Sequence, residues 1–163
     1  MLAVPRDHAR IQTSIWRNRE FRDLGRDAQH LYFTILSQPT LSYCGVMDWW
    51  PNRLAALSAG TDEAEVFAAV KELIEAEFVF VDPNTSELLV RTYVKHDGVL
   101  QRVNMGKALG RAMEKVASMP LLDLLIGELG RLYSSQPHLQ GWTGLADLYP
   151  DDFDRIVAEA RAA

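Results

Sequence analysis

Several features that define large classes of proteins are missing from this sequence. Cys44 is the only cysteine, so no intramolecular disulfide can form, and we expect its thiol to be a small buried side chain in a reducing compartment. The most apolar stretch, residues 119–126, contains Asp123 and is far shorter than the roughly 20 residues that cross a bilayer. The first ten residues lack the apolar core of a secretory signal. We therefore expect a soluble, cytoplasmic protein with no membrane partner.

Motifs for catalysis and for cofactor binding are also missing. The histidines His8, His30, His96 and His138 are scattered, and none has the spacing of a metal site. His96 and Asp97 form the only candidate dyad, but adjacent side chains point apart and no activated serine or cysteine motif accompanies them. Neither common type of glycine-rich phosphate-binding loop is present. These absences favour a protein that is not an enzyme and that has no cofactor or metal.

Charge is acidic overall but unevenly distributed. The formal net charge of -5 gives no global attraction to nucleic acid, so any such binding must come from a local patch. Residues 27–90 carry ten acidic residues against only Arg53 and Lys71. By contrast, residues 1–26 carry six arginines against three acids, and residues 91–115 carry six basic residues against two acids. These two basic regions are the candidates for contact with an anionic partner.

The chain before residue 40 contains short patterns that lead into one clear helix. Residues 11–16 are rich in strand formers, and residues 18–25 allow a brief helical turn that ends at a glycine. From Asp27 onward, apolar residues recur with the period of one helical face, and this helix must end before Pro39. Its expected buried positions are Ala28, Leu31, Tyr32 and Ile35.

A short strand and two closely spaced helices are predicted next. Residues 45–49 alternate loosely, as a strand does, and Pro51 suits the first turn of a helix through Ala59. Gly60 would end that helix and Thr61 would cap the next one, so the two helices should cross steeply, as in a helix-turn-helix. The buried stripe expected on the second helix is Val66, Val70, Leu73 and Ile74.

A β-hairpin is predicted after these helices. Residues 78–81 and 88–94 are rich in strand formers and flank the turn residues 82–87. In the earlier strand, the adjacent Trp49 and Trp50 should point to opposite faces, so that one enters the core and the other is exposed.

Helical periodicity dominates the chain after Gly98. One helix is predicted with Gly106 and Gly110 four residues apart, where another element could approach closely. Residues 142–161 suggest a further short helix with Pro150 and Asp151 near its start. We expect these helices to pack on the preceding region or to form a surface for self-association. The apolar positions of the first helix are Met105, Leu109, Met113 and Val116, and those of a second helix, after Pro120, are Leu121, Leu122, Leu125, Leu129 and Leu132.

The order of these elements and several short strings resemble a known family. The strings are SIW at 14–16, DAQHLY at 27–32, GVMDW at 45–49 before RLA at 53–55, LLVR at 88–91 and VKHDG at 94–98. They are similar to the N-terminal winged helix-turn-helix domain of phage and prophage replication proteins of the replisome-organiser type, often labelled helix-turn-helix proteins in actinobacterial phages. The resemblance implies DNA binding linked to replication or phage regulation, and it brings no catalytic motif.

We therefore expect a mainly α, α+β fold in which a winged helix-turn-helix domain with an N-terminal arm spans residues 1–98. A helical extension packed on that domain would span residues 99–163. The expected function is a phage or prophage DNA-binding protein that acts in replication initiation or transcription regulation in the cytoplasm of a bacterial host. In the alternative, the acidic helix at 62–77 docks a host or phage protein and the chain is an adaptor. A second copy of the chain, bound in a homodimer, is a further expected partner.

If DNA is the partner, exposed arginine and lysine side chains should supply the phosphate contacts, because guanidinium groups present paired donors that stay charged. The helix expected to read bases is acidic and is repelled by phosphate, so direct reading of bases is the less favoured mode. Lys107, Arg111 and Lys115 recur every four residues and predict a basic ridge; the alternative is an ordinary solvated helix face. The candidate DNA-binding residues are Arg17, Arg19, Arg22, Arg26, Arg91, Lys95, Arg102, Lys107, Arg111 and Lys115.

Overall fold

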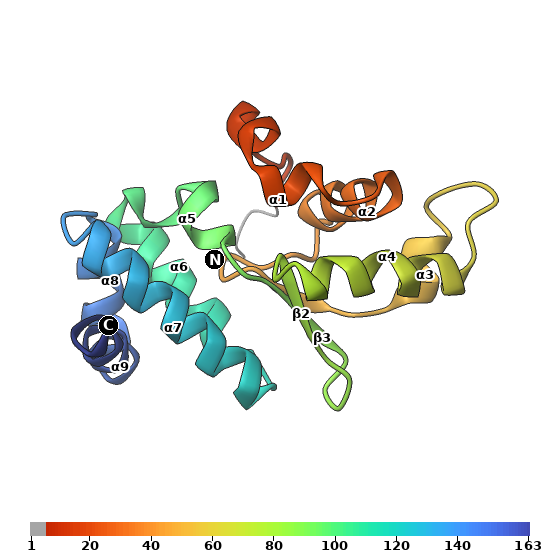
Figure 1. Ribbon diagram of the computed structural model, residues 1–163. Coiled ribbons are helices and arrows are strands. Elements are labelled where there is room, and N and C mark those ends of the chain that lie inside the picture. The colour runs from red at the N-terminus through yellow and green to blue at the C-terminus, as the bar shows by residue number, and fades with distance from the viewer. Residues whose placement is uncertain (1–5) are drawn as a thin grey trace.

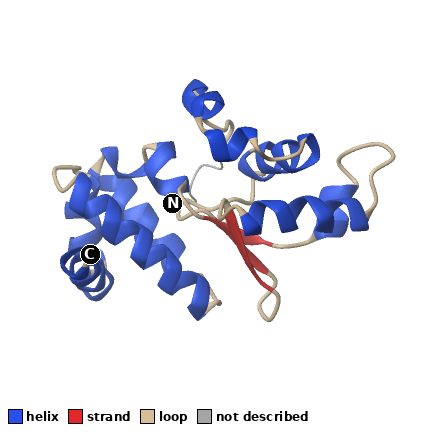
Figure 2. Ribbon diagram, viewed as in Figure 1, coloured by secondary structure: helices blue, strands red, loops and turns tan. Residues whose placement is uncertain are grey.

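A three-stranded antiparallel sheet separates two groups of helices in the computed structural model, which describes residues 6–163 (Figures 1 and 2). The strand order is β1-β3-β2. Helices α1 to α4 lie on one side of the sheet in Figure 1, and α5 to α9 lie on the other. The expected fold class, mainly α with a minor β part, is confirmed. With η for a 3-10 helix, the elements are η1 (Thr13–Arg17), α1 (Arg19–Arg22), α2 (Arg26–Leu36), β1 (Val46–Asp48), α3 (Pro51–Ala55), α4 (Glu63–Glu75), β2 (Val79–Asp82), β3 (Glu87–Val90), α5 (Tyr93–Asp97), η2 (Val99–Gln101), α6 (Val103–Glu114), α7 (Met119–Ser135), α8 (Gly141–Leu148) and α9 (Pro150–Ala162).

Helix α2 follows its apolar periodicity, whereas the segment before it does not form the expected strand. The prediction of a strand over residues 11–16 is wrong. The 3-10 helix η1 forms over most of this segment, and Trp16 packs its ring on Phe21, with 5.6 Å between the ring centroids. The brief helix α1 is present, but Gly25 begins α2 as its N-cap instead of ending the turn. The buried residues of α2 are the four that the spacing predicted, Ala28, Leu31, Tyr32 and Ile35.

The connection between α3 and α4 is longer than expected. Helix α3 ends at Ala55, and Gly60 lies in the following loop with a φ of +76°, so the prediction of a two-residue connection is wrong. The N-cap of α4 is Asp62, not Thr61. The Asp62 carboxylate accepts a hydrogen bond from the N–H of Glu65 at 2.9 Å, and the Glu65 carboxylate accepts one from the N–H of Asp62 at 2.9 Å. The buried residues of α4 are Val66, Ala69, Val70 and Leu73, and Ile74 is half-buried.

The expected hairpin is present, but its second strand is shorter than predicted. Strands β2 and β3 pair antiparallel, and β1 pairs with the other edge of β3. The strand predicted over 88–94 stops at Val90, because Tyr93 begins helix α5 and buries its side chain there. The alternation predicted for the two tryptophans is confirmed, since Trp49 is 7% exposed and Trp50 is 41% exposed.

Two buried carboxylates at the end of the hairpin hold the start of α7. Asp82 and Glu87 are opposite each other in the β2–β3 register and are 9% and 7% exposed. Glu87 accepts hydrogen bonds from the backbone N–H groups of Ala117, at 3.1 Å, and Ser118, at 2.7 Å. The Ser118 hydroxyl donates to Asp82 and caps α7 by accepting from the N–H of Leu121. The bond from Ser118 lowers the pKa of Asp82 below its ordinary value.

The C-terminal helices pack through glycines, as their spacing predicted. A Cβ atom at Gly106 would lie 1.8 Å from the carbonyl oxygen of Gly141 in α8, and one at Gly110 would lie 2.1 Å from the ring of Tyr149. The expected close approach is therefore confirmed. The helix expected to start near Pro150 and Asp151 is confirmed, since α9 begins at Pro150. A separate helix, α8, was not predicted; it ends before this proline, which has no N–H to continue it.

The hydrophobic core is continuous across the sheet. Leu73 of α4, Leu88 of β3 and Leu125 of α7 are all buried in it. Cys44 is also buried there, as expected, and burial raises the pKa of its thiol. Within residues 6–163, every helix is too short or too polar to cross a bilayer.

Replacing Gly106 with alanine should lower the free energy of unfolding by about 1–3 kcal/mol, because the added methyl group would overlap the backbone of Gly141. Gly127→Ala is the matched control. Gly127 also lies within a helix, but outside that helix no atom of the described residues is within 4 Å of its Cβ position, so this change should stabilise the protein by about 0.5–1 kcal/mol. Urea unfolding followed by circular dichroism measures both variants. Equal effects would contradict the close approach of α6 and α8.

Ser118→Ala should lower the free energy of unfolding by about 1 kcal/mol at neutral pH, because α7 loses its N-cap and the Asp82 carboxylate loses a hydrogen-bond donor. Ser134→Ala, which removes an exposed hydroxyl from the same helix, should change it by less than about 0.5 kcal/mol. Chemical denaturation of both variants measures these differences.

The Ser118→Ala effect should also depend on pH. The pKa of Asp82 is lowered in the folded state from its ordinary value of 3.8, so the stability that this carboxylate contributes is complete above that value and is lost as the pH falls below it. The difference between the wild type and Ser118→Ala should therefore narrow below about pH 4. A difference that stays constant between about pH 7 and about pH 2.5 would exclude the bond between Ser118 and Asp82 as its source.

Candidate nucleic-acid interface

The ten basic residues expected to contact DNA fall into three groups in the structure. The first group is Arg17, Arg19, Arg22 and Arg26 in η1, α1 and the first residue of α2; the second is Arg91, Lys95 and Arg102 between β3 and α6; the third is Lys107, Arg111 and Lys115 in α6. Every member of the first group is exposed, whereas Arg91 and Lys107 are half-buried. We call the first group the arginine surface.

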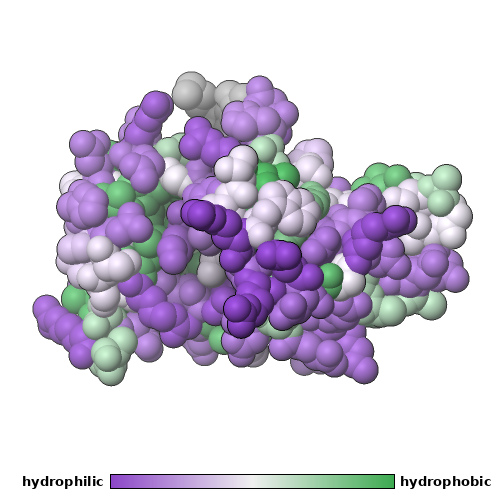
Figure 3. Space-filling model, turned by 45° about the horizontal axis from the view of Figure 1, so that its top comes forward, coloured by the Kyte–Doolittle hydropathy of each residue, from purple (hydrophilic) through white to green (hydrophobic). Residues whose placement is uncertain are grey.

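An aromatic cluster positions the arginine surface. The Asn18 side chain caps α1 by accepting a hydrogen bond from the N–H of Phe21 at 3.3 Å. Phe21 is fully buried and packs its ring against Trp16 and Phe33, so the single turn of α1 is anchored by its inward-facing residue. Arg19 and the other charged residues of this turn therefore face solvent, and the face that carries α1 is mostly hydrophilic (Figure 3).

The arginine surface has no internal counterions within the described part of the chain. Across residues 6–163, none of its four guanidinium groups lies within 4 Å of a carboxylate, so their charges remain available to an anionic partner.

Helix α4 borders the arginine surface through one hydrogen bond. The Glu72 carboxylate accepts from the backbone N–H of Gly25 at 2.9 Å, and Gly25 is the N-cap of α2. This places a negative charge at the start of α2, where the helix dipole favours it. Because Gly25 lies between Arg22 and Arg26 in the chain, the exposed face of α4 and the arginine surface are neighbours.

Most carboxylates of α4 have a structural partner. Glu65 belongs to the capping box with Asp62, Glu72 holds Gly25, and Glu75 lies 3.9 Å from the ammonium group of Lys71. The hydrogen bonds of Glu65 and Glu72 stabilise the starts of α4 and α2, whereas the exposed pair of Glu75 and Lys71 contributes little to stability.

Exposed aromatic side chains lie at the end of the molecule formed by α3 and α4. Phe67 is 49% exposed and packs edge-on against Trp49, with 6.2 Å between ring centroids. The exposed Trp50 ring holds the guanidinium group of Arg53 at 4.1 Å from its centroid. Figure 3 shows white and pale green side chains over this end, so it is less polar than the face that carries α1.

The basic residues of α6 do not form a uniformly exposed ridge. Lys107 is half-buried beside α8, where a Cβ at Gly144 would lie 3.3 Å from its Cγ atom. Arg111 and Lys115 are exposed and line a cavity of about 320 Å³ between α6 and the edge strand β1, together with Met47. This third group thus lies among α6, α8 and β1, and the structure does not bring it together with the arginine surface.

Arg91 lies in a recess, not on an exposed face. Its side chain is 31% exposed, and its Nη1 atom is 3.8 Å from the Glu128 carboxylate of α7. The same Glu128 oxygen accepts a hydrogen bond from Arg131 at 2.6 Å. The Nε atom of Arg91 is buried and has no hydrogen-bond partner within the described residues.

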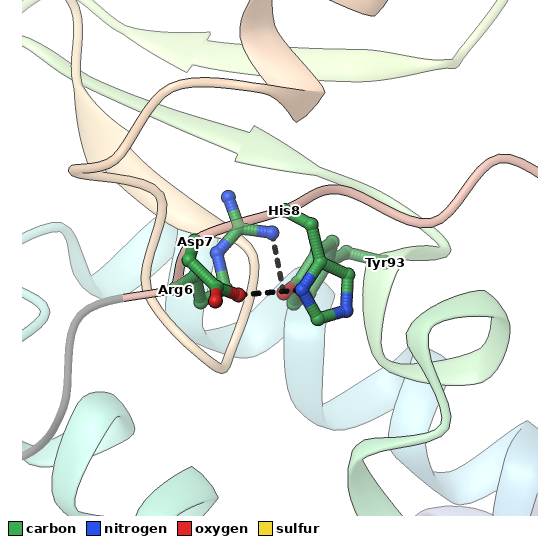
Figure 4. Close-up of polar contacts among 4 residues, drawn as sticks. All are labelled: Arg6, Asp7, His8 and Tyr93. Carbon is green, nitrogen blue, oxygen red and sulfur yellow. Dashed lines mark hydrogen bonds and ion pairs between the residues drawn. The ribbon is translucent and has the colours of Figure 1, made fainter.

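The N-terminal segment is tied to both helical groups by Arg6, which sequence reasoning missed (Figure 4). Its guanidinium group donates to the Tyr93 hydroxyl at 3.1 Å and to the carbonyl oxygens of Leu36, at 3.1 Å, and Gln38, at 2.9 Å. The neighbouring Asp7 is paired with a histidine and is exposed. Burial is the main reason that the pKa of Tyr93 is raised. The contacts of Arg6 span 30 positions or more along the chain, so no local pattern could have indicated them.

Replacing Glu72 with alanine should lower the free energy of unfolding by about 0.5–2 kcal/mol, because the N–H at the start of α2 loses its acceptor. Glu75→Ala serves as the control on the same helix. The partner of Glu75, Lys71, is exposed and 3.9 Å away, so Glu75→Ala should change the free energy of unfolding by less than about 0.5 kcal/mol. Thermal unfolding measures both; equal stabilities would show that Glu72 does not hold the start of α2.

No family model matches the chain, and no curated protein and no solved structure matches it. Within residues 6–163, His, Cys, Asp and Glu side chains do not gather in any group of three or more that could hold a metal ion. The function is therefore inferred from the fold, the charges and the cavities.

Proposed function

We propose that the chain is a winged-helix DNA-binding protein that acts in replication initiation or transcription regulation of a phage or prophage. The element order α2-β1-α3-α4-β2-β3 supports this, because a helix, a short strand, two helices and a hairpin follow one another as in a winged helix-turn-helix. In this proposal α4 is the recognition helix, the loop between β2 and β3 is the wing, and α6 to α9 form the helical extension.

The observation that carries the proposal is the arginine surface beside α4. Four exposed arginines without carboxylate partners among residues 6–163 lie within one short stretch of chain, next to the helix that would enter the major groove. Guanidinium groups are well suited to phosphate because they offer several charged donors in a fixed plane. The surface therefore has the chemistry to hold the backbone of a duplex along α4.

The charges of α4 predict how such a protein would read DNA. Contacts to phosphate position a protein on the duplex but carry no sequence information. On the exposed face of α4, Lys71 is the only cation, while Ala64 and Ala68 are small enough to let the backbone of the helix approach the bases. We therefore propose binding that is dominated by phosphate contacts, with limited direct reading of bases and with dimerisation as the route to greater affinity.

The salt dependence of binding tests this function. Arg22→Gln/Arg26→Gln should weaken binding to a duplex of about 20 base pairs and reduce the slope of log K against log salt by about 0.9 for each lost phosphate contact. Fluorescence anisotropy between about 50 and about 200 mM salt gives that slope. Arg155→Gln/Arg161→Gln in α9 removes the same charge from the far end of the molecule and should leave the slope unchanged. If the two double variants gave the same slope of log K against log salt, the result would contradict the proposal.

The second candidate is an adaptor that docks a protein through α4. The exposed Phe67 and Trp50 favour it, because exposed aromatic side chains surrounded by polar ones are typical of protein interfaces. The two functions differ in what the chain does with DNA at low salt. Saturable binding that Arg22→Gln/Arg26→Gln weakens favours the DNA-binding function. No binding to duplex or single-stranded DNA at about 50 mM salt favours the adaptor.

A further inference from the structure

Arg91 is a partly buried cation that has few hydrogen bonds to residues 6–163. Its guanidinium group can donate five hydrogen bonds, yet the Nε atom is buried without a partner. Among residues 6–163, the one carboxylate within 4 Å of its guanidinium group is that of Glu128, which is 3.8 Å away and accepts a shorter bond from Arg131. Unpaired buried donors are unfavourable, and each one in a folded protein calls for an explanation.

The recess around Arg91 opens into two adjoining cavities. Arg91, Thr92 and Lys95 line both of them. The larger cavity, about 350 Å³, lies between the N-terminal segment, α2 and α5, and the smaller one, about 270 Å³, lies between α5 and α7. The larger volume is within the range of about 300–1,000 Å³ that is typical of small-molecule sites.

The larger cavity combines a cationic rim with an apolar wall. Arg10 from the N-terminal segment joins Arg91 and Lys95 on the rim, against the carboxylates of Glu20 and Asp97. Burial raises the pKa of the Tyr32 phenol in the wall to about 12. The apolar wall is made by Ile11, Ile15, Tyr32, Leu36 and Phe78.

The shape of this cleft separates it from the arginine surface. A duplex presents its phosphates on a broad convex surface, which exposed side chains such as Arg22 can reach. Arg91 is enclosed by the N-terminal segment on one side and by α7 on the other. Arg6 fixes the N-terminal segment across the end of the cleft through its bonds to Tyr93 and Leu36, which both line the larger cavity. A small anion suits this enclosure better than a nucleic-acid backbone does.

We propose that this cleft binds a small organic anion, with its carboxylate or phosphate group on Arg91 and Lys95 and its apolar or aromatic body against Tyr32 and Phe78. The anionic group would accept the hydrogen bonds that Arg91 leaves unmade. The ligand would also bridge the N-terminal segment to α5, so binding would raise the stability of the folded protein by mass action. This site goes beyond DNA binding and does not depend on it.

A titration of the full chain with four probes tests the proposal. Phenyl phosphate and benzoate carry both an aromatic body and an anionic group, inorganic phosphate has only the charge, and phenol has only the ring. We expect saturable binding of at least one aromatic anion with a Kd on the order of 1 mM or tighter, and binding of inorganic phosphate and of phenol at least about tenfold weaker. Two-dimensional amide NMR should place the shifts at Thr92, Lys95 and Ile15. Whichever of phenyl phosphate and benzoate binds more tightly shows whether the site prefers a phosphate or a carboxylate group.

Two variants locate the binding site. Arg91→Gln should weaken binding of the better probe about tenfold or more, and Lys95→Gln, whose side chain is exposed, should weaken it about threefold without changing the melting temperature. Arg53→Gln removes an arginine from α3, outside the cleft, and should leave the affinity unchanged. The amide spectrum of each variant reports whether it is folded, and Lys95→Gln keeps the test decisive if Arg91→Gln unfolds. Absence of saturable binding by both aromatic anions, or equal affinity in Lys95→Gln and the wild type, would overturn the proposal.

Discussion

The hydrogen bonds from Ala117 and Ser118 to the carboxylates of Asp82 and Glu87 attach the start of α7, and with it the C-terminal helical group, to the sheet. A hairpin end that faces solvent can keep its carboxylates hydrated, but here both are almost fully covered. Buried carboxylates are tolerated when donors surround them, and two backbone N–H groups, one hydroxyl group and the turn at Asn84 supply those donors. The start of α7 is thus bonded to the same strands that pair beneath α4.

This attachment has consequences on both sides of the sheet. On the C-terminal side it places α7 so that Glu128 lies near Arg91, and α7 forms one wall of the smaller of the two cavities that Arg91 lines. On the N-terminal side the sheet supports α4, whose Glu72 holds the start of α2 beside the arginine surface. The exposed arginine surface and the enclosed cleft around Arg91 therefore pack on the same hydrophobic core, and they differ in how far their cations are enclosed.

Local patterns in the sequence predicted the parts of the fold that depend on neighbours along the chain. The buried face of α2 and the close approach at Gly106 are set by helical periodicity and by the absence of a side chain, and both are confirmed. The cap of α4 could also have been read, because Asp62 followed three residues later by Glu65 is a capping-box pattern; the preceding Thr61 was the wrong choice. The helix face and the cap need no knowledge of distant segments. At Gly106 the glycine spacing predicted that some element would come close, but its identity as α8 depends on the tertiary packing.

The expectations that failed, and the features that were missed, depend on distant contacts. Residues 11–16 contain strand formers, but aromatic partners in α1 and α2 hold them in a 3-10 helix. Tyr93 favours strands by type, yet it starts α5, where Arg6 bonds its hydroxyl from far along the chain. The recess of Arg91 likewise requires α7 beside β3, so the sequence could indicate its charge but not its enclosure.

The joining of the two helical groups through the hairpin carboxylates is tested most directly by native-state amide hydrogen exchange on the full chain. If the bonds to Glu87 tie α7 to the sheet, the amides of Ala117 and Ser118 open only when the whole protein unfolds. Their exchange should then give the same opening free energy as the buried amides of β3. Exchange of Ala117 and Ser118 at the fast rates of a fraying helix end, while β3 stays protected, would contradict the account.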